Sequence, residues 1–328
     1  MSQKLAHGGR LMLARRMFPE APSPFLDLST GINPHAYRLP PLPPASFTRL
    51  PEPEEISALE QEAARVYGVD DPAMVVAAPG TQALIQWLPR LFPQASVTIL
   101  APTYAEHAHA WASAGTRVTT ASSPAAFADS PAAVLCNPNN PDGRRWPATA
   151  LLAAAPRDLL VVDEAFLDLE DDAAALTCAT RLPHPGVVVL RSFGKTYGLA
   201  GVRLGFALAA PSRAAALRAA LGSWAVSGVA IAAGRAALAD TAWRDTMRAR
   251  LRRDAAELDA CLTAAGLTVV GGTLLFRLAE GDHAPALFQR LGRAGILVRR
   301  FADQPRRLRF GLPAMPEDWA RLRAALAD

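Results

Sequence analysis

Short apolar runs alternate with amphipathic segments along the middle of the chain. Several runs are apolar at every position, which is typical of strands buried on both faces of a parallel sheet. The pattern predicts strands over residues 74–78, 97–101, 132–136, 159–162 and 187–190, and helices over 54–67, 80–91, 104–114 and near 147–155. This alternation predicts an α/β fold, with a mostly parallel mixed sheet between helices.

After residue 211 the pattern changes and favours a second, smaller α+β domain. It predicts helices over 212–221, from 229 to about 265, near 285–294 and from 317, and strands over 274–278, 297–299 and 308–310. Ten of the 28 prolines fall between residues 19 and 53, which excludes a long helix there and predicts an extended arm. We therefore expect an arm over 1–45 that contributes to the small domain, a large domain over 46–215 and a small domain over 216–328.

Composition limits the classes of partner. No apolar run is long enough to span a bilayer, and the N-terminal residues lack a signal-peptide pattern, so we expect a cytoplasmic protein without a membrane partner. The three cysteines are far apart and show neither metal-binding spacing nor a disulfide framework. His107 and His109, two residues apart on a predicted helix, lie on different faces, so we assign them no metal site.

Charge gives two clusters of arginine. The net charge is +4, and the arginine-rich run over 248–253 lies inside a long helical pattern that also contains Asp245, Asp254, Glu257 and Asp259. This run predicts a solvated helix face, so we expect no nucleic-acid partner. The second cluster falls in predicted strands near the C-terminus and would suit a small anionic ligand; its members are Arg299, Arg300, Arg306, Arg307 and Arg309.

Lysine is nearly absent: only Lys4 and Lys195 occur, and the other 32 of the 34 basic residues are arginine. Arginine stays protonated, with a pKa above about 12, whereas lysine loses its proton more readily and forms a Schiff base with an aldehyde. Lys195 lies deep inside the chain among Ser, Gly and Arg residues. We favour a lysine that carries an aldehyde cofactor over a leftover surface lysine.

Polar residues follow the predicted strands, where doubly wound sheets bind ligands. Gly80 and Thr81 open a helix after a strand, an arrangement that suits a phosphate or serves as an ordinary turn. Asp163 ends an apolar run and would pair with a protonated pyridine nitrogen or cap a helix. Ser192 and Arg203 flank Lys195 and would bind phosphate.

Two further residues complete this set. Asn140 lies in a turn rich in proline and asparagine, and its amide would meet a phenolate oxygen, although such a turn needs no function. Tyr104 would stack on an aromatic ring or lie in the core. Together the residues fit pyridoxal 5′-phosphate, which acts as an electron sink for carbanions at an amino acid's α-carbon.

Three motifs carry a resemblance to a known family. They are Asn-Pro-Asn-Asn-Pro-x-Gly at 137–143, Asp-Glu-Ala-Phe at 163–166, and Ser-x-x-Lys at 192–195 followed eight residues later by Arg203. In these motifs the chain resembles fold type I pyridoxal-phosphate enzymes of the aminotransferase superfamily. The resemblance implies a homodimer with active sites at the interface, and it implies that Arg309 binds the substrate α-carboxylate.

Within the superfamily the chain resembles two groups, the histidinol-phosphate aminotransferases and the threonine-phosphate decarboxylases of cobalamin biosynthesis. Three features favour the decarboxylases: the segment His7-Gly8-Gly9, the segment 29–34 with Gly31 and Asn33, and Phe166 where aminotransferases usually have Tyr.

The decarboxylase resemblance implies that His7, Gly31, Asn33, Asn140 and Arg299 contact the substrate, and that Lys195 and Asp163 are catalytic. The expected reaction converts L-threonine O-3-phosphate to (R)-1-amino-2-propanol O-2-phosphate.

Two alternatives remain, an aminotransferase and a non-catalytic regulatory module that binds the cofactor. Retention of Lys195, Asp163 and Arg309 together argues against the module. Leu50 occupies a position where many relatives have a Tyr that reaches the neighbouring subunit's cofactor phosphate, so we expect that contact to be missing.

Overall fold

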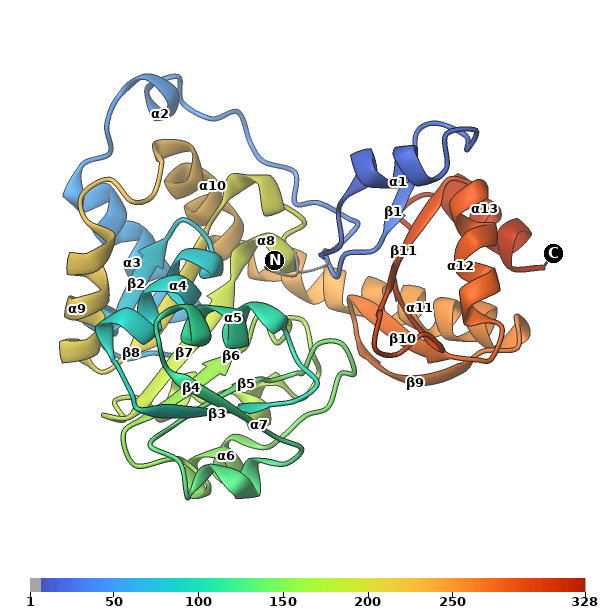
Figure 1. Ribbon diagram of the computed structural model, residues 1–328. Coiled ribbons are helices and arrows are strands. Elements are labelled where there is room, and N and C mark those ends of the chain that lie inside the picture. The colour runs from blue at the N-terminus through green and yellow to red at the C-terminus, as the bar shows by residue number, and fades with distance from the viewer. Residues whose placement is uncertain (1–6, 328) are drawn as a thin grey trace. The chain divides into compact units, whose positions relative to one another are not determined.

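The computed structural model describes residues 7–327, which divide into two compact units. The large unit comprises Ala36–Asn140 and Arg145–Asp245. The small unit comprises the described residues up to His35, the segment Pro141–Arg144 and the described residues from Thr246 onward. Figure 1 shows both units, with their elements labelled where there is room.

A seven-stranded sheet forms the centre of the large unit, in the order β2-β8-β7-β6-β5-β3-β4. Strand β8 is antiparallel to both of its neighbours, and the other pairs are parallel, which confirms the predicted mostly parallel mixed sheet. The strands are β2 (Val75–Ala78), β3 (Ser96–Leu100), β4 (Arg117–Ala121), β5 (Ala132–Cys136), β6 (Leu159–Asp163), β7 (Val187–Ser192) and β8 (Gly205–Ala209).

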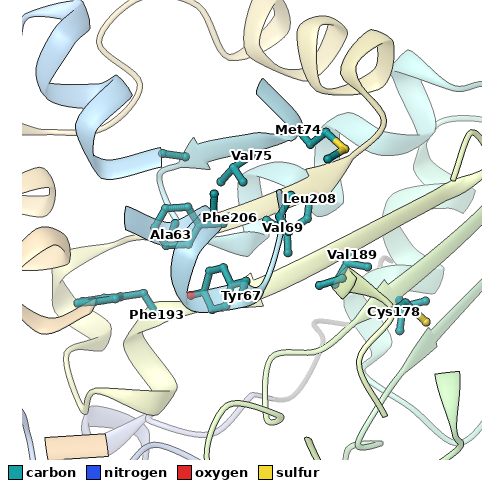
Figure 2. Close-up of a cluster of buried hydrophobic side chains, with 14 of the residues drawn as sticks. Ala63, Tyr67, Val69, Met74, Val75, Cys178, Val189, Phe193, Phe206 and Leu208 are labelled. Carbon is teal, nitrogen blue, oxygen red and sulfur yellow. The ribbon is translucent and has the colours of Figure 1, made fainter. Parts of the chain in front are cut away.

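Helices cover both faces of this sheet. The four central strands, β5 to β8, are therefore buried at every position but one. One apolar core joins one sheet face to α3 (Pro53–Tyr67), α6 (Ala148–Ala153) and α10 (Gly228–Ala239), and Figure 2 shows part of it. A second core joins the other face to α4 (Thr81–Leu91), α5 (Ala105–Ser113) and α9 (Pro211–Leu221). The shorter helices of this unit are α2 (Ala45–Thr48), α7 (Ala173–Leu176) and α8 (Phe193–Thr196).

The small unit contains a five-stranded sheet in the order β1-β11-β12-β10-β9. Strand β1 comes from the N-terminal arm and pairs in parallel with β11, and the remaining pairs are antiparallel. The strands are β1 (Leu26–Leu28), β9 (Thr268–Thr273), β10 (Phe276–Glu280), β11 (Ile296–Arg300) and β12 (Arg307–Gly311). The helices are α1 (Leu11–Met17), α12 (Ala284–Arg293), α13 (Pro316–Ala327) and most of α11 (Thr241–Ala264).

The structure differs from two sequence-based expectations. The single helix expected from 229 to about 265 is wrong: the chain forms α10 and α11, which are separated at Asp240. The Asp240 carboxylate accepts a hydrogen bond from the backbone N–H of Trp243 at 2.9 Å, so it caps the start of α11. The boundaries of the large unit also lie at residues 35 and 245 rather than at 45 and 215. The C-terminal boundary comes later because α9 and α10 pack on the sheet and helices of the large unit.

Four strands were not predicted, namely β1, β4, β8 and β9. Strand β4 lies at the sheet edge with three of its five residues exposed, so it lacks an apolar run. Strand β9 contains two adjacent glycines, which weaken a strand pattern. In the part of the chain that the structure describes, no helix is both long enough and apolar enough to cross a membrane.

Candidate active site

The large unit brings several predicted cofactor residues to one edge of its sheet. Asp163 is the last residue of β6, Ser192 is the last residue of β7, and Asn140 follows β5. Strands β5, β6 and β7 are adjacent and parallel, so their carboxyl ends meet. This is the edge at which open α/β sheets bind ligands.

Asp163 is almost fully buried and has a partner that keeps it charged. Its Oδ2 lies 3.0 Å from Nε2 of His107, and its Oδ1 accepts a hydrogen bond from the backbone N–H of Ala165 at 3.1 Å. Burial raises the pKa of Asp163, but the hydrogen bond and charge of His107, the charge of Lys195 and the Ala165 N–H together hold this pKa below its ordinary value. The site therefore contains a buried carboxylate anion.

His107 is the residue that sequence reasoning missed. Burial lowers the pKa of His107, yet its hydrogen bonds to Asp163 and Cys136 and their charges raise that pKa to about 10. His107 comes three residues after Tyr104, the residue that directly precedes α5, and the two rings are in contact. That spacing was the available signal, because Tyr104 was already a candidate.

His107, Asp163 and Cys136 approach one another closely. Their ligand atoms all lie within 4.8 Å of one another, and Sγ of Cys136 is 3.9 Å from Oδ2 of Asp163. The hydrogen bond between imidazole and carboxylate accounts for this proximity without a metal ion. We therefore interpret the cluster as a device that stabilises the charge of Asp163.

Lys195 lies on the short helix α8 and is partly buried. Its Nζ is 4.3 Å from the ring centroid of Phe166 and 6.0 Å from that of Tyr104. The Tyr104 and His107 rings meet edge to face, with centroids 6.0 Å apart. Lys195 and two aromatic side chains therefore gather beside Asp163, as a flat pyridine cofactor would require.

The predicted phosphate ligands meet at the start of α4. Gly80 precedes this helix with φ 81°, and a Cβ added there would lie 2.6 Å from Nη2 of Arg203. The absence of a side chain at Gly80 thus lets the guanidinium approach the helix N-terminus. Arg203 itself adopts a left-handed conformation and donates a hydrogen bond to the carbonyl of Ala200.

Strand β8 lies next to both Ser192 and Thr81. Gly205 pairs with Ser192 in the sheet, and a Cβ on Gly205 would lie 2.7 Å from the backbone nitrogen of Thr81. The first turn of α4 contains no acidic residue. A helix N-terminus with a neighbouring arginine and two hydroxyl groups suits a phosphate monoester.

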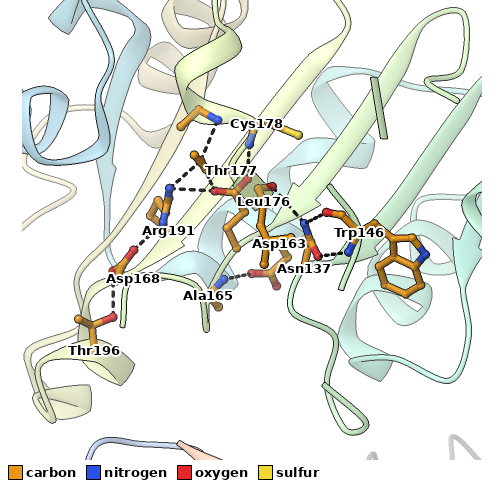
Figure 3. Close-up of polar contacts among 12 residues, drawn as sticks. Asn137, Trp146, Asp163, Ala165, Asp168, Leu176, Thr177, Cys178, Arg191 and Thr196 are labelled. Atoms are coloured by element: carbon orange, nitrogen blue, oxygen red, sulfur yellow. Dashed lines mark hydrogen bonds and ion pairs between the residues drawn. The ribbon is translucent and has the colours of Figure 1, made fainter. Parts of the chain in front are cut away.

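The asparagine-rich turn contains two residues with structural roles. Asn137 donates to the carbonyls of Trp146 at 2.9 Å and Leu176 at 3.2 Å, and Figure 3 shows these bonds. Asn139 donates to the carbonyl of Pro102 and accepts a hydrogen bond from Thr103. These bonds place the buried Asn140 at the sheet edge.

The small unit contains the predicted carboxylate ligand, Arg309, which is 3% exposed on β12. Its Nη2 donates to the carbonyl of Ser29 at 2.8 Å, and its guanidinium lies 5.0 Å from the Phe276 ring centroid. Burial and the neighbouring charge of Arg299 lower the pKa of Arg309 to about 9. Arg299 faces Arg309 across the β11–β12 pair.

The glycines after His7 pack against the loop that follows β1. A Cβ on Gly8 would lie 2.3 Å from the carbonyl oxygen of Ser29, and the Gly9 N–H donates to Oγ of Ser29 at 2.7 Å. This packing brings His7 and Arg299 together. Both residues line one cavity of about 140 Å³, which Arg10 and Arg300 also line.

Two other predicted substrate residues lie in the same loop. Asn33 is 2% exposed, and its Oδ1 accepts a hydrogen bond from the backbone N–H of His35 at 2.9 Å. Gly31 is buried beside Thr30, whose carbonyl would lie 2.5 Å from a Cβ on Gly311. The loop is thereby held against the end of β12.

Comparison with known proteins identifies the family. The model of class I and II aminotransferases matches residues 42–324.

The chain belongs to the class I and II aminotransferase family.

Within this family, the chain is 42% identical over 330 residues to threonine-phosphate decarboxylase from Pseudomonas aeruginosa, covering 98% of this chain and 97% of that protein. It is 40% identical over 335 residues to threonine-phosphate decarboxylase from Sinorhizobium sp., covering 100% of this chain and 99% of that protein. A structural neighbour is histidinol-phosphate aminotransferase from Sinorhizobium meliloti, solved with pyridoxal 5′-phosphate. It has a TM-score of 0.82 and 24% identity, and the match covers 99% of this chain and 95% of that one, which shows the shared fold.

Proposed function

We propose that this family member is a pyridoxal-phosphate-dependent decarboxylase that converts L-threonine O-3-phosphate to (R)-1-amino-2-propanol O-2-phosphate for cobalamin biosynthesis. One observation carries the choice of substrate. The small unit places a cavity lined by His7 and Arg299 on the strand next to buried Arg309. Such a substrate has two anionic groups, a phosphate for the cavity and a carboxylate for Arg309. The two full-length relatives named threonine-phosphate decarboxylase support this choice.

The residues of the large unit fit the cofactor, whose bound pyridine ring supplies an electron sink for the α-carbon. Asp163 is a buried anion, so it would pair with the protonated pyridine nitrogen. Lys195 would hold the aldehyde carbon, Tyr104 would lie on the ring, and Asn140 would donate to the phenolate oxygen. The cofactor phosphate would be held by Gly80, Thr81, Ser192 and Arg203.

The substrate anchors determine which bond breaks at the α-carbon. We propose that His7, Arg299 and the segment with Gly31 and Asn33 hold the substrate phosphate, and that Arg309 orients the carboxylate. The orientation that these anchors impose would select the bond between the α-carbon and the carboxylate for cleavage, with release of carbon dioxide. Nζ of Lys195 would then supply the proton that replaces the carboxylate on the α-carbon.

Phe166 distinguishes this proposal from the aminotransferase alternative. Its ring lies against Nζ of Lys195, and it carries no hydroxyl that would contact the cofactor's phenolate oxygen. Aminotransferases usually have Tyr at this position. A regulatory module without turnover has no need for both a buried carboxylate-binding arginine and an aldehyde-binding lysine.

The experiment that tests the function is carbon dioxide release from L-threonine O-3-phosphate with 2-oxoglutarate omitted. Sustained release at one equivalent per amine product is the expected result. The proposal would be rejected by no release combined with glutamate-dependent transamination of the 2-oxo partner of histidinol phosphate. A protein that binds the cofactor without either reaction would instead support the regulatory module.

We further propose a cytoplasmic homodimer, with a cofactor-binding large domain and a small domain completed by the N-terminal arm. Cys136, Cys178 and Cys261 are free thiols, which suits a reducing compartment. Leu50 is 60% exposed, so its surface is accessible to a second subunit. Because leucine lacks a hydroxyl, we propose that any cross-subunit contact to the cofactor phosphate through this position is lost.

A further inference from the structure

A buried ion-pair cluster lies behind the candidate site and is not part of it. Its charged members are Glu164, Asp168 and Arg191. Arg191 Nη2 is 2.9 Å from Oε2 of Glu164, and Arg191 Nη1 is 2.5 Å from Oδ1 of Asp168. The Glu164 side chain is 0% exposed, and those of Arg191 and Asp168 are 5% and 7% exposed. Figure 3 shows the contact between Arg191 and Asp168.

The cluster is adjacent in sequence to three of the predicted cofactor ligands. Glu164 follows Asp163, Arg191 precedes Ser192, and Thr196 follows Lys195. Oγ1 of Thr196 donates a hydrogen bond to Oδ2 of Asp168 at 2.9 Å. Asp168 therefore links β7, through Arg191, to the helix that carries Lys195.

The strand geometry explains why the cluster lies on the opposite side from the candidate site. Side chains alternate between the two faces of a strand, so Arg191 and Ser192 point in opposite directions. Asp163 lies on the same face as Val161, which belongs to the core with α4 and α5. The guanidinium of Arg191 lies 4.9 Å from the ring of Tyr67, which belongs to the opposite core. Each strand end thus presents one residue to the candidate site and one to the cluster.

Helix α8 depends on such contacts because it is only four residues long and has no side-chain cap at its start. On a helix, residues 193, 196 and 197 share a face, and residue 195 points away from them. Phe193 and Tyr197 stack with centroids 4.7 Å apart within the Tyr67 core. The hydrogen bond from Thr196 to Asp168 is a polar contact on this anchored face.

We propose that Asp168, held by Arg191 and Glu164, is a positioning residue that fixes α8 and thereby aims Lys195 at the cofactor. Glu164 is fixed in turn, because it accepts hydrogen bonds from the N–H of Cys178 at 2.7 Å and from Thr177 at 2.9 Å. This inference rests on the proposed function, since it assigns Lys195 as the cofactor-binding residue. The cluster lies on the face of the sheet opposite to the candidate site, so we place its effect on Lys195 through α8.

The test compares Thr196→Val with Thr196→Ser in the full-length protein. Valine keeps the shape of the side chain but removes the hydroxyl, and serine restores the hydroxyl. Thr98→Val is a matched control, because the buried Thr98 also shares a partly buried side-chain hydrogen bond, with the Thr119 hydroxyl at 3.0 Å, but in another part of the sheet. Two properties are measured: amide hydrogen exchange of residues 192–199 in cofactor-free protein, and the steady-state kinetics of the loaded enzyme.

We expect Thr196→Val to raise hydrogen exchange in α8 by about tenfold and to lower kcat by about tenfold or more, with KM changed less than about twofold. Thr196→Ser should restore both values. Thr98→Val should lower the thermal midpoint and leave both unchanged. If Thr196→Val behaves like Thr98→Val, the cluster is only structural and the inference is wrong.

Asp168→Asn is a second variant in case Thr196→Val does not fold. It keeps the size of the side chain and weakens the link between Arg191 and Thr196, so we expect the same increase in α8 exchange. Unchanged exchange in this variant would also overturn the inference. The exchange measurement needs neither substrate nor cofactor, so failure of the proposed function shows itself separately, as absent carbon dioxide release by the wild-type enzyme.

Discussion

Nε2 of His107 lies 3.0 Å from Oδ2 of Asp163, and the two side chains are 1% and 4% exposed. An isolated carboxylate at this depth would take up a proton, because burial disfavours its charged form. Burial also disfavours the charged imidazole, but the hydrogen bonds and charges of Asp163 and Cys136 outweigh this effect and raise the pKa of His107. The pair therefore keeps Asp163 ionised at the end of β6.

This pair predicts a pH-dependent loss of stability in His107→Asn. The lowered pKa of Asp163 means that its contribution is present above its unfolded pKa of about 3.9 and is lost as pH falls through the folded value. The pKa of His107, raised to about 10, means that its contribution is present below about pH 6.5 and is lost as pH rises through 10. We expect the variant to lose about 3–5 kcal/mol of unfolding free energy between pH 4 and 6.5, and less toward pH 10.

Urea denaturation of cofactor-free protein at pH 5.5, 8 and 10 measures this difference. His109→Asn is the control, because His109 lies two residues further along the same helix and is exposed. It should leave the unfolding free energy unchanged at all three pH values. A deficit in His107→Asn that does not vary with pH would contradict a charged pair.

Lys195 leads to a prediction about covalent attachment. Because the sequence contains only Lys4 and Lys195, borohydride reduction of the loaded enzyme should add cofactor mass to the peptide with Lys195 alone. Lys195→Ala should lose both this adduct and the visible Schiff-base absorbance, and Lys4→Ala should keep both. Absorption spectra measure the Schiff-base band, and peptide mass spectrometry locates the adduct. An adduct that persists in Lys195→Ala would show that another group holds the aldehyde.

The sequence predicted those parts of the fold that local patterns determine. The strand over 132–136 matches β5, because all five residues are buried and the sequence is a continuous apolar run. Lys195 and Asp163 were recognisable because one is a rare interior lysine and the other ends an apolar strand. The structure places Lys195 beside the aromatic rings of Tyr104 and Phe166, and Asp163 beside His107, although their roles toward the cofactor stay predictions.

Tertiary packing determined what the sequence did not reveal. The spacing of Tyr104 and His107 is visible in the sequence. The sequence does not show that His107 on α5 contacts Asp163 at the end of β6. Arg191 lies in an apolar strand, and only the fold shows that it meets two carboxylates, Glu164 and Asp168, from the connection between β6 and α7. Strand β4 forms because β3 supplies its hydrogen-bond partners, despite its polar sequence.

Arg309 leads to a prediction about substrate affinity. Arg309→Lys keeps the positive charge but loses the two parallel N–H groups that match a carboxylate. We expect KM for L-threonine O-3-phosphate to rise by about 30-fold or more, since losing a buried charged contact costs about 2–5 kcal/mol. Because the pKa of Arg309 is lowered to about 9, kcat/KM of the wild-type enzyme should also fall above that pH.

Steady-state kinetics from pH 7 to 10 test both expectations for Arg309. Arg306→Lys serves as the matched control, because Arg306 is 59% exposed and pairs with Asp282 at the surface. It should change KM by less than about twofold. An unchanged KM in Arg309→Lys would remove Arg309 from the carboxylate site.

His7 leads to a prediction about binding of the substrate phosphate. The residue lines the same cavity as Arg299, and the following Gly8 is held against Ser29 so closely that a Cβ would clash with its carbonyl. The position of His7 is thus set by backbone packing and should survive truncation of its ring. We therefore expect His7→Ala to raise KM for the phosphorylated substrate by about tenfold or more, because a hydrogen bond to a charged group contributes about 1.5–3 kcal/mol.

The inhibition constant of inorganic phosphate should rise in parallel in His7→Ala, since phosphate alone would occupy the same cavity. The inhibition constant of unphosphorylated L-threonine should stay within about twofold of the wild-type value, because that ligand has no group for His7 to bind. Gly8→Ala, in contrast, should displace the whole segment and weaken both ligands. Equal weakening of phosphate and L-threonine by His7→Ala would mean that His7 supports the loop and does not bind the phosphate.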